Sequence, residues 1–100
     1  MLSNRSAVIT GSTSGIGLAM ARALAAQNCN IMLNGLGDAA EIEKTRAALE
    51  SEFAVKVTYH GADMTRPAEI RELIEATADL HGGLNILVNN AGIQHTAPAD

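Results

Sequence analysis

The chain alternates short apolar segments with longer helix-forming segments, and this alternation restricts the folds open to it. Four short segments are apolar and β-prone: residues 7–9, 30–33, 55–59 and 84–88. Three longer segments favour helices: residues 14–28, 39–53 and 66–81. Strands that are separated by helices of this length run parallel, with right-handed crossovers. The order βαβαβαβ therefore predicts an α/β fold with a doubly wound parallel sheet.

The apolar pattern of the segments also predicts their order in the sheet. Three of them are continuous apolar runs, which is typical of strands that are covered on both faces. Residues 55–59 instead alternate polar and apolar side chains, and this favours an edge position. We therefore expect the strand order 3-2-1-4. The helix that leads to the fourth strand should have Thr65 as its N-cap, Pro67 in its first turn and Gly82 at its end.

Composition argues against several kinds of partner. The net charge is −4 and the seven Lys and Arg residues are scattered, so we expect neither nucleic acid nor an anionic membrane as a main partner. Aromatic content is 2%, too little for a base-stacking surface. No segment approaches the roughly 20 apolar residues of a membrane span. The single Cys29 excludes an internal disulfide and a multi-cysteine metal site. Together with the lack of a signal-like N-terminus, it leads us to expect a cytoplasmic protein.

A glycine-rich sequence lies between the first strand and the first helix, Thr10-Gly11-Ser12-Thr13-Ser14-Gly15-Ile16-Gly17. Gly11 permits a tight turn, Gly15 lets a ligand approach the backbone, and Gly17 lets the helix pack closely against the sheet. The free N–H groups at the helix start suit a pyrophosphate. An ordinary turn with glycines for geometry alone is the alternative. The strand before the turn and the helix after it favour the ligand site.

The residues after the second strand indicate which dinucleotide would bind. Residues 34–38 contain no Lys or Arg, and the first cation beyond them is Lys44. The 2′-phosphate of NADP would therefore lack a cationic partner, which is unfavourable in a partly desolvated site. The sequence predicts NAD. Asp38 and Glu41 have the spacing of a capping box, so we favour a cap over a ribose contact for Asp38. Leu36 is expected to pack against the adenosine.

Asp63 directly follows the third apolar segment. Its carboxylate could accept a hydrogen bond from an adenine amino group. A loop acid, or an additional cap for the next helix, is an equally good interpretation of this residue from the sequence.

Three motifs together resemble the short-chain dehydrogenase/reductase family: the glycine-rich turn, Asp63, and Asn89-Asn90-Ala91-Gly92 after the fourth strand. They lie at the family's spacing and cover most of the chain. The resemblance implies a Rossmann domain that binds a nicotinamide dinucleotide. The last motif emerges where strands one and four diverge, and ligands bind at such a switch point. A polar turn that caps the strand is the alternative there.

The resemblance also implies a role for individual residues. The phosphate side would be lined by Thr13, Ser14, Gly15 and Ile16. Adenine would be held by Asp63, with Met64 packing beside it. The ribose side would be lined by Asn90, Ala91 and Gly92. Asn89 would tie the central strands together.

Within the family, the chain is similar to members that interconvert D-3-hydroxybutyrate and acetoacetate, in residues 34–38, 61–64 and 90–95. This implies hydride transfer between NAD and a small hydroxy acid. Gln94 would contact the substrate carboxylate, although a loop amide facing water explains it equally well. The family usually forms tetramers, so a homotetramer is expected. A 3-oxoacyl thioester reductase and a non-catalytic dinucleotide-binding module are the alternatives.

The family's catalytic Ser, Tyr, Lys and Asn are not expected among these residues. The single tyrosine, Tyr59, has Asp63 four positions later where the family's motif has Lys. We therefore expect residues 1–100 to be the N-terminal part of one NAD-binding domain, with the catalytic residues beyond Asp100. The whole enzyme should have about 250 residues, a usual size for a single α/β domain.

Overall fold

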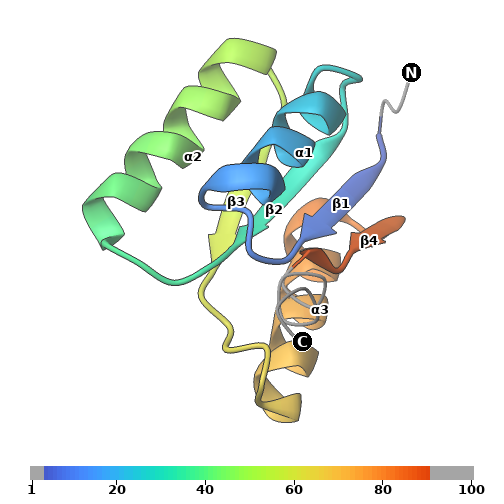
Figure 1. The fold of residues 1–100 in the computed structure, drawn as a ribbon. Coiled ribbons are helices and arrows are strands. Elements are labelled where there is room, and N and C mark those ends of the chain that lie inside the picture. The colour runs from blue at the N-terminus through green and yellow to red at the C-terminus, as the bar shows by residue number, and fades with distance from the viewer. Residues whose placement is uncertain (1–3, 91–100) are drawn as a thin grey trace.

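A four-stranded parallel sheet with helices on both faces forms the described part of the computed structural model, residues 4–90 (Figure 1). The elements in chain order are β1 (Ser6–Ile9), α1 (Gly15–Ala25), β2 (Asn30–Asn34), α2 (Ala39–Phe53), β3 (Val57–His60), α3 (Pro67–His81) and β4 (Ile86–Val88). The strand order is β3-β2-β1-β4, and each neighbouring pair is parallel. The predicted Rossmann topology and strand order are confirmed.

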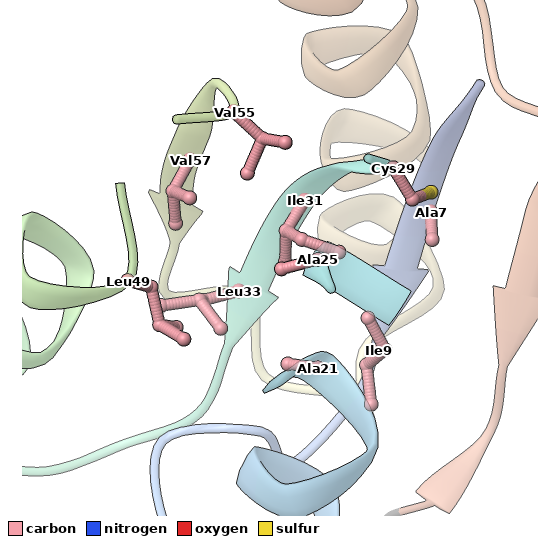
Figure 2. Packing of buried hydrophobic residues seen from close by; sticks show 10 residues of the cluster. All are labelled: Ala7, Ile9, Ala21, Ala25, Cys29, Ile31, Leu33, Leu49, Val55 and Val57. Atoms are coloured by element: carbon pink, nitrogen blue, oxygen red, sulfur yellow. The ribbon is translucent and has the colours of Figure 1, made fainter. Parts of the chain in front are cut away.

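Alternate side chains of the strands belong to two separate hydrophobic cores, one on each face of the sheet. Helices α1 and α2 cover one face of the sheet, where Ala21 and Leu49 meet the odd-numbered residues of β1, β2 and β3 (Figure 2). Helix α3 covers the other face, where Leu73 packs with Val8 and Met32. This division follows from the period of two along a strand, since successive side chains point to opposite faces. Both β1 and β2 therefore consist almost entirely of buried residues.

Burial of β4 differs from the sequence prediction. Its apolar run, residues 86–88, predicts a strand that is covered on both faces, but Leu87 is 55% exposed. The strand lies at an edge of the described sheet, and it pairs there with β1 alone. The prediction of full cover is therefore wrong for Leu87 within the described residues.

Two helix boundaries also differ from expectation. Thr65 is not the N-cap of α3: Arg66 occupies that position, and the Thr65 hydroxyl donates to Asp63 instead. Helix α1 ends at Ala25 rather than at residue 28, because Asn28 turns the chain with a positive φ of 68°. The predicted cap of α2 is confirmed, since the Asp38 carboxylate accepts from the amide of Glu41 at 3.0 Å.

The outer edge of β3 is covered by two charged side chains of α2. The Val57 amide donates to Glu50 Oε2 at 3.1 Å, and the Val57 carbonyl accepts from Arg46 Nη1 at 2.9 Å. Arg46 also pairs with Glu50 at 3.1 Å. The bond from Val57, together with that from Arg46, lowers the pKa of the Glu50 carboxyl. These contacts occupy backbone groups that an edge strand otherwise presents to another chain.

Acid should destabilise the fold through His81. The imidazole Nε2 lies 2.7 Å from Thr58 Oγ1, whereas Nδ1 is buried with no partner among the described residues. Burial, with a smaller effect of Lys56, lowers the pKa of His81 below its usual 6.5. The unfolded chain then binds a proton more readily than the folded one. Stability contributed by the neutral ring is therefore lost as the pH falls below about 6.5.

We expect the free energy of unfolding of the complete protein to decrease between pH 7.5 and pH 5.5. Replacing His81 by Gln should flatten that part of the profile. Denaturant titrations at several pH values measure both effects. An equally steep decrease in the His81→Gln variant would show that another group is responsible.

Candidate functional site

Four loops gather at the carboxyl edge of the sheet, where the strands end: residues 10–14, 35–38, 61–66 and 89–90. Parallel strands deliver all their outgoing loops to this edge, and ligands of open α/β sheets bind there. The glycine-rich turn, Asp63 and the segment Asn89-Asn90 therefore lie at the same edge of the sheet. Ala91, Gly92 and Gln94 lie outside the described residues.

The glycine-rich turn has the backbone geometry that its glycines predict. Gly11 and Gly15 have positive φ angles of 62° and 59°, which residues with a side chain rarely adopt. A Cβ atom built at Gly15 would meet nothing within 4 Å. The backbone at Gly15 thus faces open space, as an approaching ligand requires.

The start of α1 presents amides without partners to that space. Ser14 is the N-cap residue and makes no side-chain capping bond. The amides of Gly15 and Ile16 find no acceptor among residues 4–90, as is usual in the first turn of a helix that lacks a cap. Ser14, Gly15 and Ile16 are all exposed, and Ile16 is 68% exposed. The free N–H groups and the helix dipole together favour an anionic group such as a diphosphate.

Gly17 lets α1 lie close to the turn that follows β1. A Cβ at this position would lie 2.1 Å from the Gly11 carbonyl oxygen and 2.8 Å from Asn90 Nδ2. The missing side chain therefore lets the helix, the turn and the segment after β4 meet. Asn90 is buried, and its Nδ2 donates to the same Gly11 oxygen at 3.2 Å.

Asn89 connects the ends of the two central strands, in the way that the resemblance implies. Its Oδ1 lies 3.3 Å from the hydroxyl of Thr10, and the Thr10 amide donates to Val88 O at 3.0 Å. The turn after β1 is thereby held against the end of β4. Asn89 and Asn90 thus both hold the turn after β1, and the contact of Asn90 with a ribose stays a prediction.

Two adjoining cavities lie beside the turn. A cavity of about 240 Å³ is lined by Gly11, Asn34, Gly35, Leu36, Ala62, Asp63, Met64 and Thr65. A second cavity of about 250 Å³ is lined by Thr13, Ser14, Leu36, Gly37, Asp38, Glu41, Ile42 and Thr45. Leu36 lines both and is 73% exposed, so its side chain forms an apolar wall between them. Such a wall suits the face of a planar ring.

Asp63 bonds within its own loop through one carboxylate oxygen. Its Oδ1 accepts from the amide and the hydroxyl of Thr65, at 2.9 and 2.7 Å. These bonds, with the nearby charge of Arg66, lower the pKa of the carboxyl. Among the described residues no donor reaches Oδ2. The loop interpretation is thus confirmed for one oxygen, while the other remains open to an amino group in the first cavity.

The second cavity is acidic at one side and has no cation in its lining. Asp38 and Glu41 both line it. Lys44, the first cation after β2, pairs with Glu41 at 3.5 Å and is not a lining residue. Neutral or cationic groups are therefore favoured here over a further phosphate.

Asn34 is the residue that sequence analysis missed. It ends β2, it is 1% exposed, and it lines the floor of the first cavity. Its side chain bonds both to the turn after β1 and to the loop after β3. The signal that could have revealed it is a lone amide at the end of the apolar run 31–33, because a buried amide needs several partners.

Tyr59 and Cys29 have structural surroundings in the described part of the chain. Tyr59 donates its hydroxyl proton to the Gly35 carbonyl and so braces the loop after β2. Residues 4–90 contain no group of three or more His, Cys, Asp or Glu side chains placed to hold a metal. No helix in these residues is long and apolar enough to span a membrane. Cys29 is a buried free thiol, and burial raises its pKa.

Replacing Gly17 by Ala should distort the turn. The added methyl group would collide with the Gly11 carbonyl, and overpacking of this kind costs about 1–3 kcal/mol. We expect a lower melting temperature and weaker dinucleotide binding, measured by thermal unfolding and by titration. For the melting temperature, Gly15→Ala is the matched control, because its methyl group meets no protein atom within 4 Å and adds only backbone strain. An equal decrease in the melting temperature of the two variants would contradict the role of Gly17.

Comparison with known proteins places this geometry in context. The chain is 52% identical over 97 residues to the D-beta-hydroxybutyrate dehydrogenase of Cupriavidus necator, covering 97% of the chain and 37% of that protein. It is 51% identical over 90 residues to the protein of the same name from Rhizobium meliloti, covering 90% of the chain and 35% of that protein. The chain therefore spans little more than a third of these relatives. The predicted resemblance to this branch is confirmed.

Solved structures share the fold. The L-sorbose reductase of Gluconobacter frateurii, in complex with NADPH and L-sorbose, superposes with a TM-score of 0.82 at 35% identity. The match covers 89% of this chain and 34% of that one. The model of the short chain dehydrogenase family matches residues 5–100. With its sheet order and its glycine-rich turn, the chain belongs to the short-chain dehydrogenase family.

Proposed function

We propose that the chain is the cofactor-binding part of an NAD-dependent dehydrogenase that interconverts D-3-hydroxybutyrate and acetoacetate. The observation that carries the proposal is the set of exposed, unpartnered amides at Gly15 and Ile16 beside two adjoining cavities. A diphosphate at the amides would leave adenosine between Leu36 and Asp63. The identity of about 50% to two dehydrogenases named for hydroxybutyrate supports the substrate.

The preference for NAD rests on charge. A ribose placed beside Leu36 would direct its 2′-oxygen towards the second cavity, which contains Asp38 and Glu41 and no cation. A 2′-phosphate would be repelled by Glu41 and would find no guanidinium or ammonium among the lining residues. A neutral 2′-hydroxyl meets no such barrier. Because the sorbose reductase was solved with NADPH, membership of the family alone does not distinguish NAD from NADP.

The residues of this chain would bind and orient the cofactor. Bound NAD would accept a hydride from the carbinol carbon of the substrate, while the hydroxyl proton passes to a base. The turn at residues 11–17 would hold the diphosphate, and Asp63 with Met64 would hold the adenine. Holding the adenine and the diphosphate in this way would orient the dinucleotide, and orientation is a large part of catalysis by proximity.

We further propose that the complete enzyme supplies what residues 4–90 do not. Ala91 and Gly92 would extend the cofactor-binding surface from Asn90, and Gln94 would donate to the substrate carboxylate. The proton-transfer residues would lie beyond Asp100, in a longer cytoplasmic protein that forms a homotetramer. The length covered in the relatives, 35–37%, supports a longer enzyme.

An assay of the complete protein tests this function directly. With D-3-hydroxybutyrate and NAD, we expect NADH to form. The absorbance of NADH at about 340 nm measures this nicotinamide reduction. The L-enantiomer serves as the control and should be inactive. Turnover of 3-oxoacyl thioesters with NADPH, and none of hydroxybutyrate, would identify the enzyme as a reductase instead. Absence of any dinucleotide binding would reject the whole proposal.

Replacing Leu36 by Arg should shift cofactor preference towards NADP. The guanidinium would stand between the two cavities and supply the missing partner for a 2′-phosphate. We expect kcat/KM with NADP to rise by about tenfold, which corresponds to roughly 1.4 kcal/mol. Leu36→Met, which keeps the apolar wall, is the control. An unchanged NADP/NAD ratio in Leu36→Arg would mean that Leu36 does not face the 2′ position.

A further inference from the structure

Asn34 uses every polar atom of its side chain to join two different loops. Oδ1 accepts from the Gly11 amide at 3.2 Å. Nδ2 donates to the carbonyl oxygens of His60 and Ala62, each at 3.0 Å. An amide has two hydrogens and one acceptor oxygen, so this group is fully engaged. At 1% exposure it is shielded from water, and each bond therefore counts in full.

The backbone of Asn34 also bonds to the glycine-rich turn. The Ser12 amide donates to the Asn34 carbonyl at 2.6 Å. In return, the Asn34 amide donates to Ser12 Oγ at 3.0 Å. Ser12 is itself completely buried. The end of β2 and the glycine-rich turn are therefore linked by both backbone and side chain.

The two loops that Asn34 joins would bind different parts of the dinucleotide. Gly11 and Ser12 belong to the turn that presents amides to the diphosphate. Ala62 immediately precedes Asp63, which lines the first cavity. Asn34 lies beneath both loops and lines the floor of that cavity. It thus fixes how far apart the two binding groups lie.

We propose that Asn34 is a positioning residue, which sets the spacing between the adenine pocket and the diphosphate turn so that the adenine and the diphosphate of ADP-ribose bind at once. This inference rests on the proposed function. Two groups linked in one ligand gain affinity only when the protein holds both subsites at a matching distance. An Asp at this position would face two carbonyl oxygens with a negative charge, and an Ala would leave all three partners unpaired.

Binding of adenosine and of ADP-ribose to the complete protein tests the inference. Adenosine reports on the adenine pocket alone, whereas ADP-ribose spans both subsites. In Asn34→Ala, we expect ADP-ribose affinity to fall by about tenfold more than adenosine affinity, as titration measures. Because spacing affects binding, the KM for NAD should rise with kcat at saturating NAD little changed.

Thr77→Val is the matched control. Thr77 is as deeply buried as Asn34, but its hydroxyl bonds to Leu73 O at 2.8 Å within α3, far along the chain from either subsite. It should lower the melting temperature and leave the ratio of the two affinities unchanged. Asn34→Ser, which keeps a small polar group, provides the same comparison if Asn34→Ala does not fold.

The outcomes separate the two proposals. If wild-type protein binds ADP-ribose and the Asn34 variants weaken both ligands equally, or neither, the positioning role is overturned and the proposed function stands. If wild-type protein binds neither adenosine nor ADP-ribose, the proposed function is overturned, and the role of Asn34 with it. A selective loss of ADP-ribose affinity in the variants, absent in Thr77→Val, supports the inference.

Discussion

The candidate site depends on one close approach between backbone atoms. Helix α1 starts so near the turn after β1 that a single methyl group at Gly17 would lie 2.1 Å from the Gly11 carbonyl. This approach brings the helix amides to the carboxyl edge of the sheet, and it leaves the Gly11 oxygen free to accept from Asn90. The other loops of the site are then arranged around a turn whose shape is already fixed.

Uncharged amide side chains hold that arrangement together. Asn34 and Asn90 each bond to backbone groups of a segment far away in the sequence. A buried amide can both donate and accept, and it avoids the desolvation that a buried charge would incur. The hydrogen bonds that Asn34 and Asn90 make between these loops therefore involve no charged side chain. A neutral framework leaves the helix amides as the main attraction for an anion.

Much of this fold can be predicted from the sequence, because its signals are local or periodic. The alternation of apolar runs and helices predicts the sheet order, and the spacing of Asp38 and Glu41 predicts the cap of α2. The role of Asn34 could not be predicted, since its partners at Gly11 and Ala62 are brought near only by the folded sheet. The exposure of Leu87 was missed for a similar reason. An apolar run predicts that the side chains of a strand are buried, but it does not show which element buries them.

Arg46 and Glu50 give the sheet two unlike margins. A further strand that approached β3 at Val57 would have to displace Arg46 and Glu50, because their side chains already bond to the Val57 backbone. Among the described residues, no side chain bonds in this way to the outer backbone groups of β4. A further strand could therefore pair with β4 more readily than with β3, because residues 46 and 50 already bind the Val57 backbone.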